Sequence, residues 1–172
     1  MKTNFPLILT ARIDEADLEP FDTLRKRHFP ADRNFIRAHV TMFHRLPGEY
    51  LDTIRDTLAD VAAFTDVFEA EVDGVRHLGA GVAFTILSPE LETVRAHLKR
   101  SVLHLLTQQD THGWRPHITV QNKVSKAAAD TLYRDLSERF QRRSLRVVGL
   151  DLWEYQGGPW RPETSFMFRA AL

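Results

Sequence analysis

The chain has 172 residues, of which 43% are hydrophobic and 27% are charged. These proportions are typical of a globular domain and exclude a disordered or fibrous chain. The 23 basic and 23 acidic residues give a formal net charge of zero, which disfavours a protein that coats long nucleic acid. There is no cysteine, which excludes disulfides, thiol nucleophiles and cysteine-based zinc sites.

The length and the N-terminal segment predict a single domain without a membrane anchor. The only apolar run near the start, Leu7-Ile8-Leu9, is too short for the core of a signal peptide or for a membrane span. A chain without cysteine fits a reducing compartment, so we expect a cytoplasmic protein. We expect one domain over residues 1–172, monomeric and without an obligatory protein partner.

The apolar periodicity predicts strands and helices in alternation. Asp14, Ser88 and Ser125 can each cap the helix that follows, and Pro89 suits a first helical position. The expected elements are a strand at 6–13, a helix from 15 to about 28, a strand at 38–44, a helix at 49–63, strands at 66–77 and 82–87, a helix at 89–108, a strand at 117–122, a helix at 126–140, and strands at 144–155 and 163–170.

This order of elements falls into two similar halves, roughly residues 1–80 and 81–172. If the strand at 82–87 opens the second half, each half contains a strand, a helix, a second strand, a helix and a hairpin. No linker-like or low-complexity segment separates the halves. The sequence therefore predicts the α+β class, with a single bilobal domain of two pseudo-symmetric lobes. Each lobe would be an antiparallel sheet with outer helices, and the active cleft would lie between the lobes.

A His-x-Thr motif occurs once in each half, as His39-Val40-Thr41 and as His117-Ile118-Thr119. On a strand, the histidine and threonine of each motif share one face, and the apolar residue between them points to the other. The two histidines are 78 positions apart (117 minus 39), which is close to half of the chain, as an internal duplication would give. One such motif could be purely structural, but two in the same context indicate a functional pair.

The first motif lies in a basic part of the sequence. Residues 25–45 contain six lysines and arginines against one acidic residue, Asp32. A local positive field of this kind suits an anionic ligand, although a solvated basic loop would give the same pattern.

Together the two motifs can support acid–base chemistry on a phosphate. Imidazole titrates near physiological pH, so one histidine can take a proton from an attacking hydroxyl or water while the other gives one to the leaving oxygen. The two threonine hydroxyls can hydrogen-bond the non-bridging oxygens of the group held between them. Phosphoryl transfer needs this combination, and histidine and threonine can supply it without a metal or another cofactor.

Two His-x-Thr strands, one in each half of a chain of this size, resemble the 2H phosphoesterase superfamily. The second copy, Arg115-Pro116-His117-Ile118-Thr119-Val120, is similar to the bacterial branch known as 2′-5′ RNA ligases or cyclic phosphodiesterases. The resemblance implies a bilobal fold and the opening of a 2′,3′-cyclic phosphate, on an RNA end or a small nucleotide, or the cleavage or ligation of a 2′-5′ RNA linkage. It also implies that His39 and His117 are the acid and the base, and that Thr41 and Thr119 bind phosphate.

Six further residues are weaker candidates for substrate binding, because packing or a salt bridge would explain each of them equally well or better. Arg37 and Arg115 lie two positions before the motif histidines and could contact phosphate. By the period of two, Phe43 and Gln121 continue the polar faces of the motif strands. Trp153 and Tyr155 share a face of the long strand and could support a nucleobase.

No metal site is expected. By the same period of two, His44 points away from His39, so the two cannot chelate one ion. Two alternatives to an enzyme stay open on the sequence alone. One is a binding module for phosphorylated RNA ends or nucleotides, and the other is a purely structural role for both histidines.

Overall fold

The long strand β6 (Arg143–Tyr155) joins the two parts of the sheet in this computed structural model, which describes residues 2–170. Its C-terminal part pairs with β1 (Leu7–Ile13) on one side and with β7 (Trp160–Met167) on the other. Its N-terminal part pairs with β3 (Phe68–His77). Because β6 is 13 residues long, it can take part in both pairings without a break.

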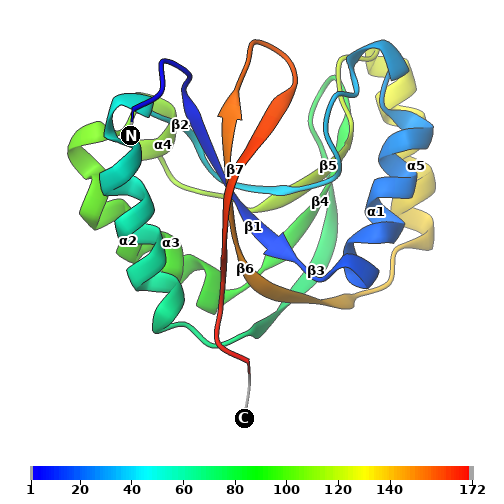
Figure 1. Ribbon diagram of the computed structural model, residues 1–172. Helices are drawn as coiled ribbons and strands as arrows, with labels where there is room; N and C mark the ends of the chain where they lie inside the picture. Colours follow the sequence, from blue (N-terminus) through cyan, green and yellow to red (C-terminus); the bar gives the residue numbers. More distant parts are fainter. Residues whose placement is uncertain (1, 171–172) are drawn as a thin grey trace.

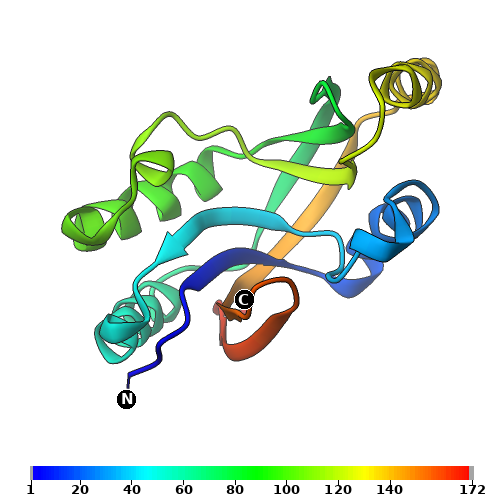
Figure 2. The same cartoon turned by 90° about the horizontal axis from the view of Figure 1, so that it is seen from above.

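The described residues form seven strands in one connected antiparallel sheet. β1 also pairs with β2 (Val40–Leu46), and β3 pairs with β4 (Val82–Leu87), which pairs with β5 (His117–Gln121). We call β2, β1, β6 and β7 the first sheet, and β5, β4, β3 and the start of β6 the second sheet. The two sheets also meet where β2 pairs with β5 through a single residue pair, Val40 and Ile118 (Figures 1 and 2).

Four helices cover the outer faces of the sheets (Figure 1). The second sheet carries α1 (Glu15–His28) and α5 (Lys126–Arg139), and the first carries α2 (Leu51–Ala63) and α3 (Pro89–Val102). The predicted bilobal α+β fold is thus confirmed. Each sheet, however, draws on both halves of the sequence, because β3 joins the second sheet while β6 and β7 join the first. The boundary near residue 80 falls in the β3–β4 turn.

Three helix starts agree with the sequence, and the end of one helix does not. The side chains of Asp14, Ser88 and Ser125 cap α1, α3 and α5 as predicted. The helix expected to reach residue 108 ends at Val102, and a 3₁₀ turn (Leu103–Leu105) and the short α4 (Gln108–Thr111) follow. The break allows Asp110 to reach the backbone of β2, a tertiary contact that local propensity cannot show. Two further 3₁₀ turns lie at Ala31–Arg33 and Gly48–Tyr50.

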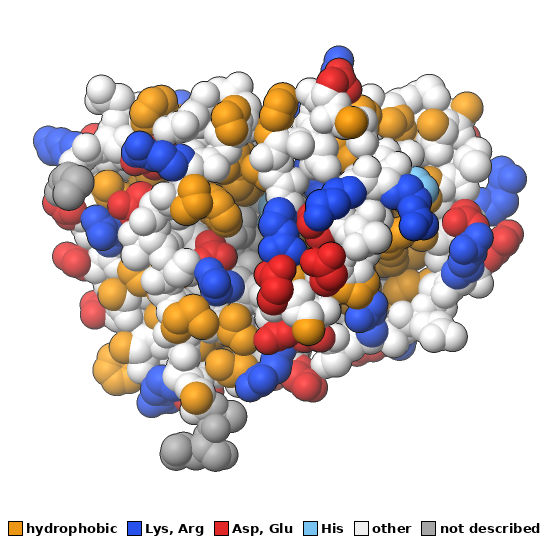
Figure 3. Space-filling view, turned by 45° about the vertical axis from the view of Figure 1, so that its right-hand side comes forward, with side chains coloured by type: hydrophobic (Ala, Val, Ile, Leu, Met, Phe, Trp, Pro, Cys, Tyr) orange, Lys and Arg blue, Asp and Glu red, His pale blue; other side chains and the backbone are white. Residues whose placement is uncertain are grey.

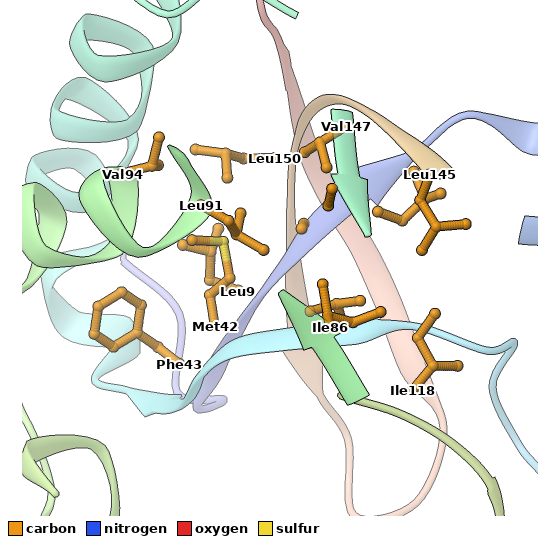
Figure 4. Packing of buried hydrophobic residues seen from close by; sticks show 14 of the residues in the cluster. Leu9, Met42, Phe43, Ile86, Leu91, Val94, Ile118, Leu145, Val147 and Leu150 are labelled. Atoms are coloured by element: carbon orange, nitrogen blue, oxygen red, sulfur yellow. The ribbon is translucent and has the colours of Figure 1, made fainter. Parts of the chain in front are cut away.

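Apolar side chains fill the space between the sheets and the helices (Figure 4). Leu9 and Met42, from β1 and β2, pack toward Leu91 of α3, while Ile118 and Leu145 lie in the part of the core that belongs to the second sheet. This core leaves the other face of the motif strands for polar side chains. In the described part of the chain, no helix is long and apolar enough to cross a membrane.

Candidate active site

The two His-x-Thr motifs lie side by side at the junction of the sheets. Val40 and Ile118 are direct partners in the antiparallel pair of β2 and β5, and both are fully buried in the core. The residues on either side of this pair therefore point to the opposite face. Antiparallel register places His39 across from Thr119 and Thr41 across from His117. Each histidine thus has the threonine of the other motif as its neighbour, and all four side chains are half-buried on one surface.

Both imidazoles are held in the same way. The Nδ1 atom of His39 lies 2.8 Å from the carbonyl oxygen of Arg37, and Nδ1 of His117 lies 2.8 Å from that of Arg115. A carbonyl oxygen only accepts hydrogen bonds, so Nδ1 carries the proton in both rings. Nε2 is then the nitrogen left for a ligand, and on both histidines it has no partner within residues 2–170. The paired motifs thus present two equivalent nitrogen atoms.

The surroundings keep both histidines neutral in the free protein. Burial lowers the pKa of His39 to about 4, against the opposing effect of the hydrogen bond to Arg37, and the nearby charges of Arg25, His117 and His44 lower it further. Burial also lowers the pKa of His117, with additional contributions from Arg76 and His44. A bound phosphate would raise both pKa values, because a negative charge favours the imidazolium form.

A β-bulge in each motif strand interrupts the alternation of side chains. Register shifts occur in the pairing of β1 with β2 and of β4 with β5, so that Met42 and Val120 are each inserted without a partner. Phe43 then pairs with Leu9, and Gln121 with Val82, on the core face. Two consecutive residues of each strand are therefore buried, three and four positions after the histidine.

Because of these bulges, three inferences made from the sequence are wrong. Phe43 is 1% exposed and Gln121 is 6% exposed, so neither continues the polar surface as the period of two predicted. The ring of Phe43 packs under the guanidinium of Arg95 instead of facing a base. His44, expected to point away from His39, returns to the same face as His39 and Thr41, because the residue before it occupies the core.

Two buried arginines support the motif strands from behind, and no sequence pattern pointed to them. Arg25 of α1 donates to the carbonyl oxygen of Thr119 at 3.0 Å. Arg95 of α3 donates to the carbonyl oxygens of Met42 at 2.9 Å and Asp110 at 3.0 Å. The helices that supply them occupy corresponding places in the two halves, so each motif strand is held by one arginine.

A pocket of about 610 Å³ opens beside His39 over the first sheet. Two tryptophans line it: Trp160, whose ring lies 4.8 Å from the imidazole of His39, and Trp153, which lies 6.1 Å from Trp160 and donates to the hydroxyl of Thr10. Arg12, bonded to Asp151 at 2.9 Å, adds polar groups to the wall. The pocket is large enough for a nucleoside and has aromatic faces on which a base could stack.

The other predicted binding residues occupy different surroundings. Arg37 lies at the pocket, but its guanidinium is engaged by the carboxylates of Glu15, Glu19 and Asp22. Arg115 is exposed, and no carboxylate in residues 2–170 pairs with it.

Of the two aromatic candidates, Trp153 lines the pocket, whereas Tyr155 is exposed beyond the pocket wall. Within residues 2–170, no cluster of three or more histidine, aspartate or glutamate side chains could hold a metal ion.

Sequence reasoning missed two residues that face the site. Trp160 lay outside the strand predicted at 163–170, but that strand begins at Trp160, opposite Tyr155 across the turn. Arg76 pairs with Ala83, which pairs with Thr119, so its side chain shares the motif surface. It is half-buried, and no carboxylate in the described chain pairs with it. On the face shown in Figure 3, basic and acidic side chains are interspersed.

Comparisons with known proteins identify the fold and the family. Three of the most similar solved structures are TT0787 of Thermus thermophilus (16% identity, TM-score 0.67), a protein described as a phosphoesterase (14%, 0.68) and Escherichia coli LigT complexed with 3′-AMP (14%, 0.66). The alignments cover 97%, 97% and 96% of this chain and 100%, 99% and 98% of the respective structures. A comparison with curated proteins found no match. The family model of the 2′-5′ RNA ligase superfamily matches residues 13–159, so the chain belongs to the 2′-5′ RNA ligase superfamily.

Proposed function

We propose that this protein is a phosphodiesterase that opens 2′,3′-cyclic phosphates on RNA ends or small nucleotides, or that cleaves or joins 2′-5′ RNA linkages. The observation that carries the proposal is the equivalent placement of His39 and His117, each with Nδ1 bound to a carbonyl and Nε2 left for a ligand. Membership of the 2′-5′ RNA ligase superfamily supports it, and so does the 3′-AMP complex of E. coli LigT.

The hydrolytic step divides the work between the two imidazoles. Nε2 of one histidine takes a proton from water, whose oxygen attacks the phosphorus. The bond from phosphorus to the 2′ or 3′ oxygen breaks, and Nε2–H of the other histidine gives that oxygen its proton. The substrate's negative charge supports the protonated form of this second imidazole, which the free protein disfavours.

In the proposed function, the threonines bind the phosphate and the pocket binds the nucleoside. Thr41 and Thr119 lie between the histidines, so their hydroxyls can donate to the two non-bridging oxygens, where charge develops. The nucleoside occupies the pocket beside His39, with its base against Trp160. The net charge of zero, with basic and acidic side chains interspersed on the face in Figure 3, favours a small nucleotide or a short RNA end over a long duplex.

The test is turnover of a nucleoside 2′,3′-cyclic phosphate and of a 2′-5′-linked dinucleotide in the presence of EDTA. We expect product in EDTA from the wild type and a loss of at least about a hundredfold in kcat for His39→Ala or His117→Ala. His97→Ala, an exposed change on α3, is the matched control. Activity that survives both active-site changes would refute the proposal. Binding of the nucleotides without turnover by the wild type would leave a binding module in its place.

A further inference from the structure

A third imidazole faces the motif surface. The bulge at Met42 turns Phe43 into the core and His44 to the side of His39 and Thr41. His44 is exposed, and its charge contributes to the lowered pKa of both His39 and His117, which places it within electrostatic reach of each. The two-histidine mechanism proposed above does not use this residue.

A fully buried carboxylate fixes the orientation of His44. Asp110 of α4 lies 3.0 Å from Nδ1 of His44 and also accepts hydrogen bonds from the backbone amides of His44 and Arg45. Burial alone would raise the pKa of Asp110, but these donors lower it, so the group is a carboxylate at neutral pH. A carboxylate accepts from Nδ1–H, so Nε2 of His44 is the nitrogen that faces solvent, and in the imidazolium form it donates a hydrogen bond to an anion. Arg95 donates to the carbonyl oxygens of Met42 in β2 and Asp110 in α4, and so links the two elements that carry His44 and its carboxylate.

The residues in and before β2 lie in a fixed order across the site, from the pocket at one end to His44 at the other. The pocket is lined by residues 35–39, which directly precede the strand, Thr41 and His117 lie where β2 pairs with β5, and His44 lies beyond them. A substrate with its nucleoside in the pocket and its reacting phosphate between the motif histidines would therefore reach His44 with whatever follows the phosphate. In nucleic acids and nucleotides, a second phosphate is the anion that occurs at such a position.

We propose that His44, oriented by Asp110, binds a second phosphate of the substrate, so that the site is built for nucleotides carrying two phosphate groups. The proposal rests on the proposed function only in placing the first phosphate between His39 and His117. His44 is a binding residue in this account, and proton transfer stays with the motif histidines.

The experiment measures binding, which does not depend on turnover. Dissociation constants are determined calorimetrically for adenosine 5′-monophosphate and adenosine 5′-diphosphate, whose second phosphate directly follows the first. We expect the wild type to bind the diphosphate about tenfold more tightly, because hydrogen bonds to charged groups are strong. His44→Ala should remove this preference and leave monophosphate binding within about twofold. His97→Ala, an exposed histidine on α3, should retain it.

Two further variants guard against a purely structural effect. Asp110→Asn keeps an acceptor for Nδ1–H without the charge, and His44→Gln keeps a donor, so each should retain part of the preference. The proposal is overturned if the wild type binds both ligands equally, if His44→Ala keeps the preference, or if that variant weakens both ligands equally. Failure to turn over any cyclic phosphate would count against the proposed function and not against this site.

Discussion

The indole ring of Trp160 lies against the imidazole of His39, with their centroids 4.8 Å apart and their planes inclined by 57°. His39 directly precedes β2 and Trp160 begins β7, and β1 and β6 lie between these two strands in the first sheet. Trp153 continues this aromatic wall into the pocket. The wall contacts His39, and in the proposed function it therefore marks the side of the site that receives the nucleoside.

Replacing Trp160 by alanine should weaken nucleoside binding more than it slows chemistry. Stacking of a base on an aromatic side chain stabilises a complex by about 1–3 kcal/mol, so KM for a nucleoside 2′,3′-cyclic phosphate should rise by about 5- to 160-fold. Trp160→Phe should recover most of the loss. Tyr155→Ala, an exposed aromatic change outside the pocket, serves as the control and should leave KM unchanged. A fall in kcat with constant KM would contradict this role.

The lowered pKa of His39 predicts a pH-dependent stability. Because the pKa is about 4 in the folded protein and about 6.5 in an unfolded chain, the unfolded state binds the proton more readily. The contribution of His39 is therefore fully present above pH 6.5 and is lost as the pH falls toward 4. The loss can reach about 1.4 kcal/mol per pH unit. Chemical denaturation of the wild type and of His39→Gln at pH 7.5 and pH 5 should show a smaller decrease in the variant.

The fold could be read from the sequence because its signals are local. The apolar stripes and the caps at Asp14, Ser88 and Ser125 gave the order of the elements and the starts of three helices. The repeated motif indicated that His39 and His117 belong together, and the structure brings them to one surface. Which sheet each strand joins depends on long-range pairing, and the exchange of β3 and β6 between the halves had no local signal.

The remainder of the site depends on features that a period of two cannot describe. A bulge adds one residue without a partner, so the side chains directly after Met42 and Val120 change face, and Phe43, His44 and Gln121 were therefore assigned to the wrong sides. Arg76 lies on the motif surface because it pairs with Ala83, which in turn pairs with Thr119. No sequence motif marks this position. Such positions become visible only when the register of the whole sheet is known.

Arg76 should tune the titration of His117. Its positive charge lowers the pKa of this histidine, so Arg76→Gln should raise that pKa, and Arg76→Lys should keep it close to the wild-type value. Nuclear magnetic resonance titration of the imidazole Cε1–H signals in the free protein measures the shift directly. His39 serves as the internal control, because Arg76 is not among the charges that lower its pKa. A titration of His117 that is identical in both variants would contradict the assignment of Arg76 to this surface.

Arg95 and Arg37 should differ sharply in their effect on stability, although both are arginines beside the first motif. Arg95 is 6% exposed, donates to the carbonyls of Met42 and Asp110, and balances the buried Asp110 carboxylate. Removing it leaves two buried carbonyl oxygens without their donor and takes a positive charge away from that carboxylate, so Arg95→Met should lower the free energy of unfolding by about 3–5 kcal/mol.

The side chain of Arg37 is 47% exposed, and its ion pairs with Glu15 and Glu19 are screened by water. The buried Asp22, which Arg37 also contacts, keeps Lys26 and the amide of Ala38 as partners, so Arg37→Met should cost only about 1 kcal/mol. Urea denaturation at neutral pH compares the two variants. At high salt, the decrease in the free energy of unfolding should become smaller for Arg37→Met and stay nearly unchanged for Arg95→Met. The reason is that salt screens exposed charges far more than buried ones. Equal losses in the two variants would show that the contacts of Arg95 to the bulge of β2 do not stabilise the site.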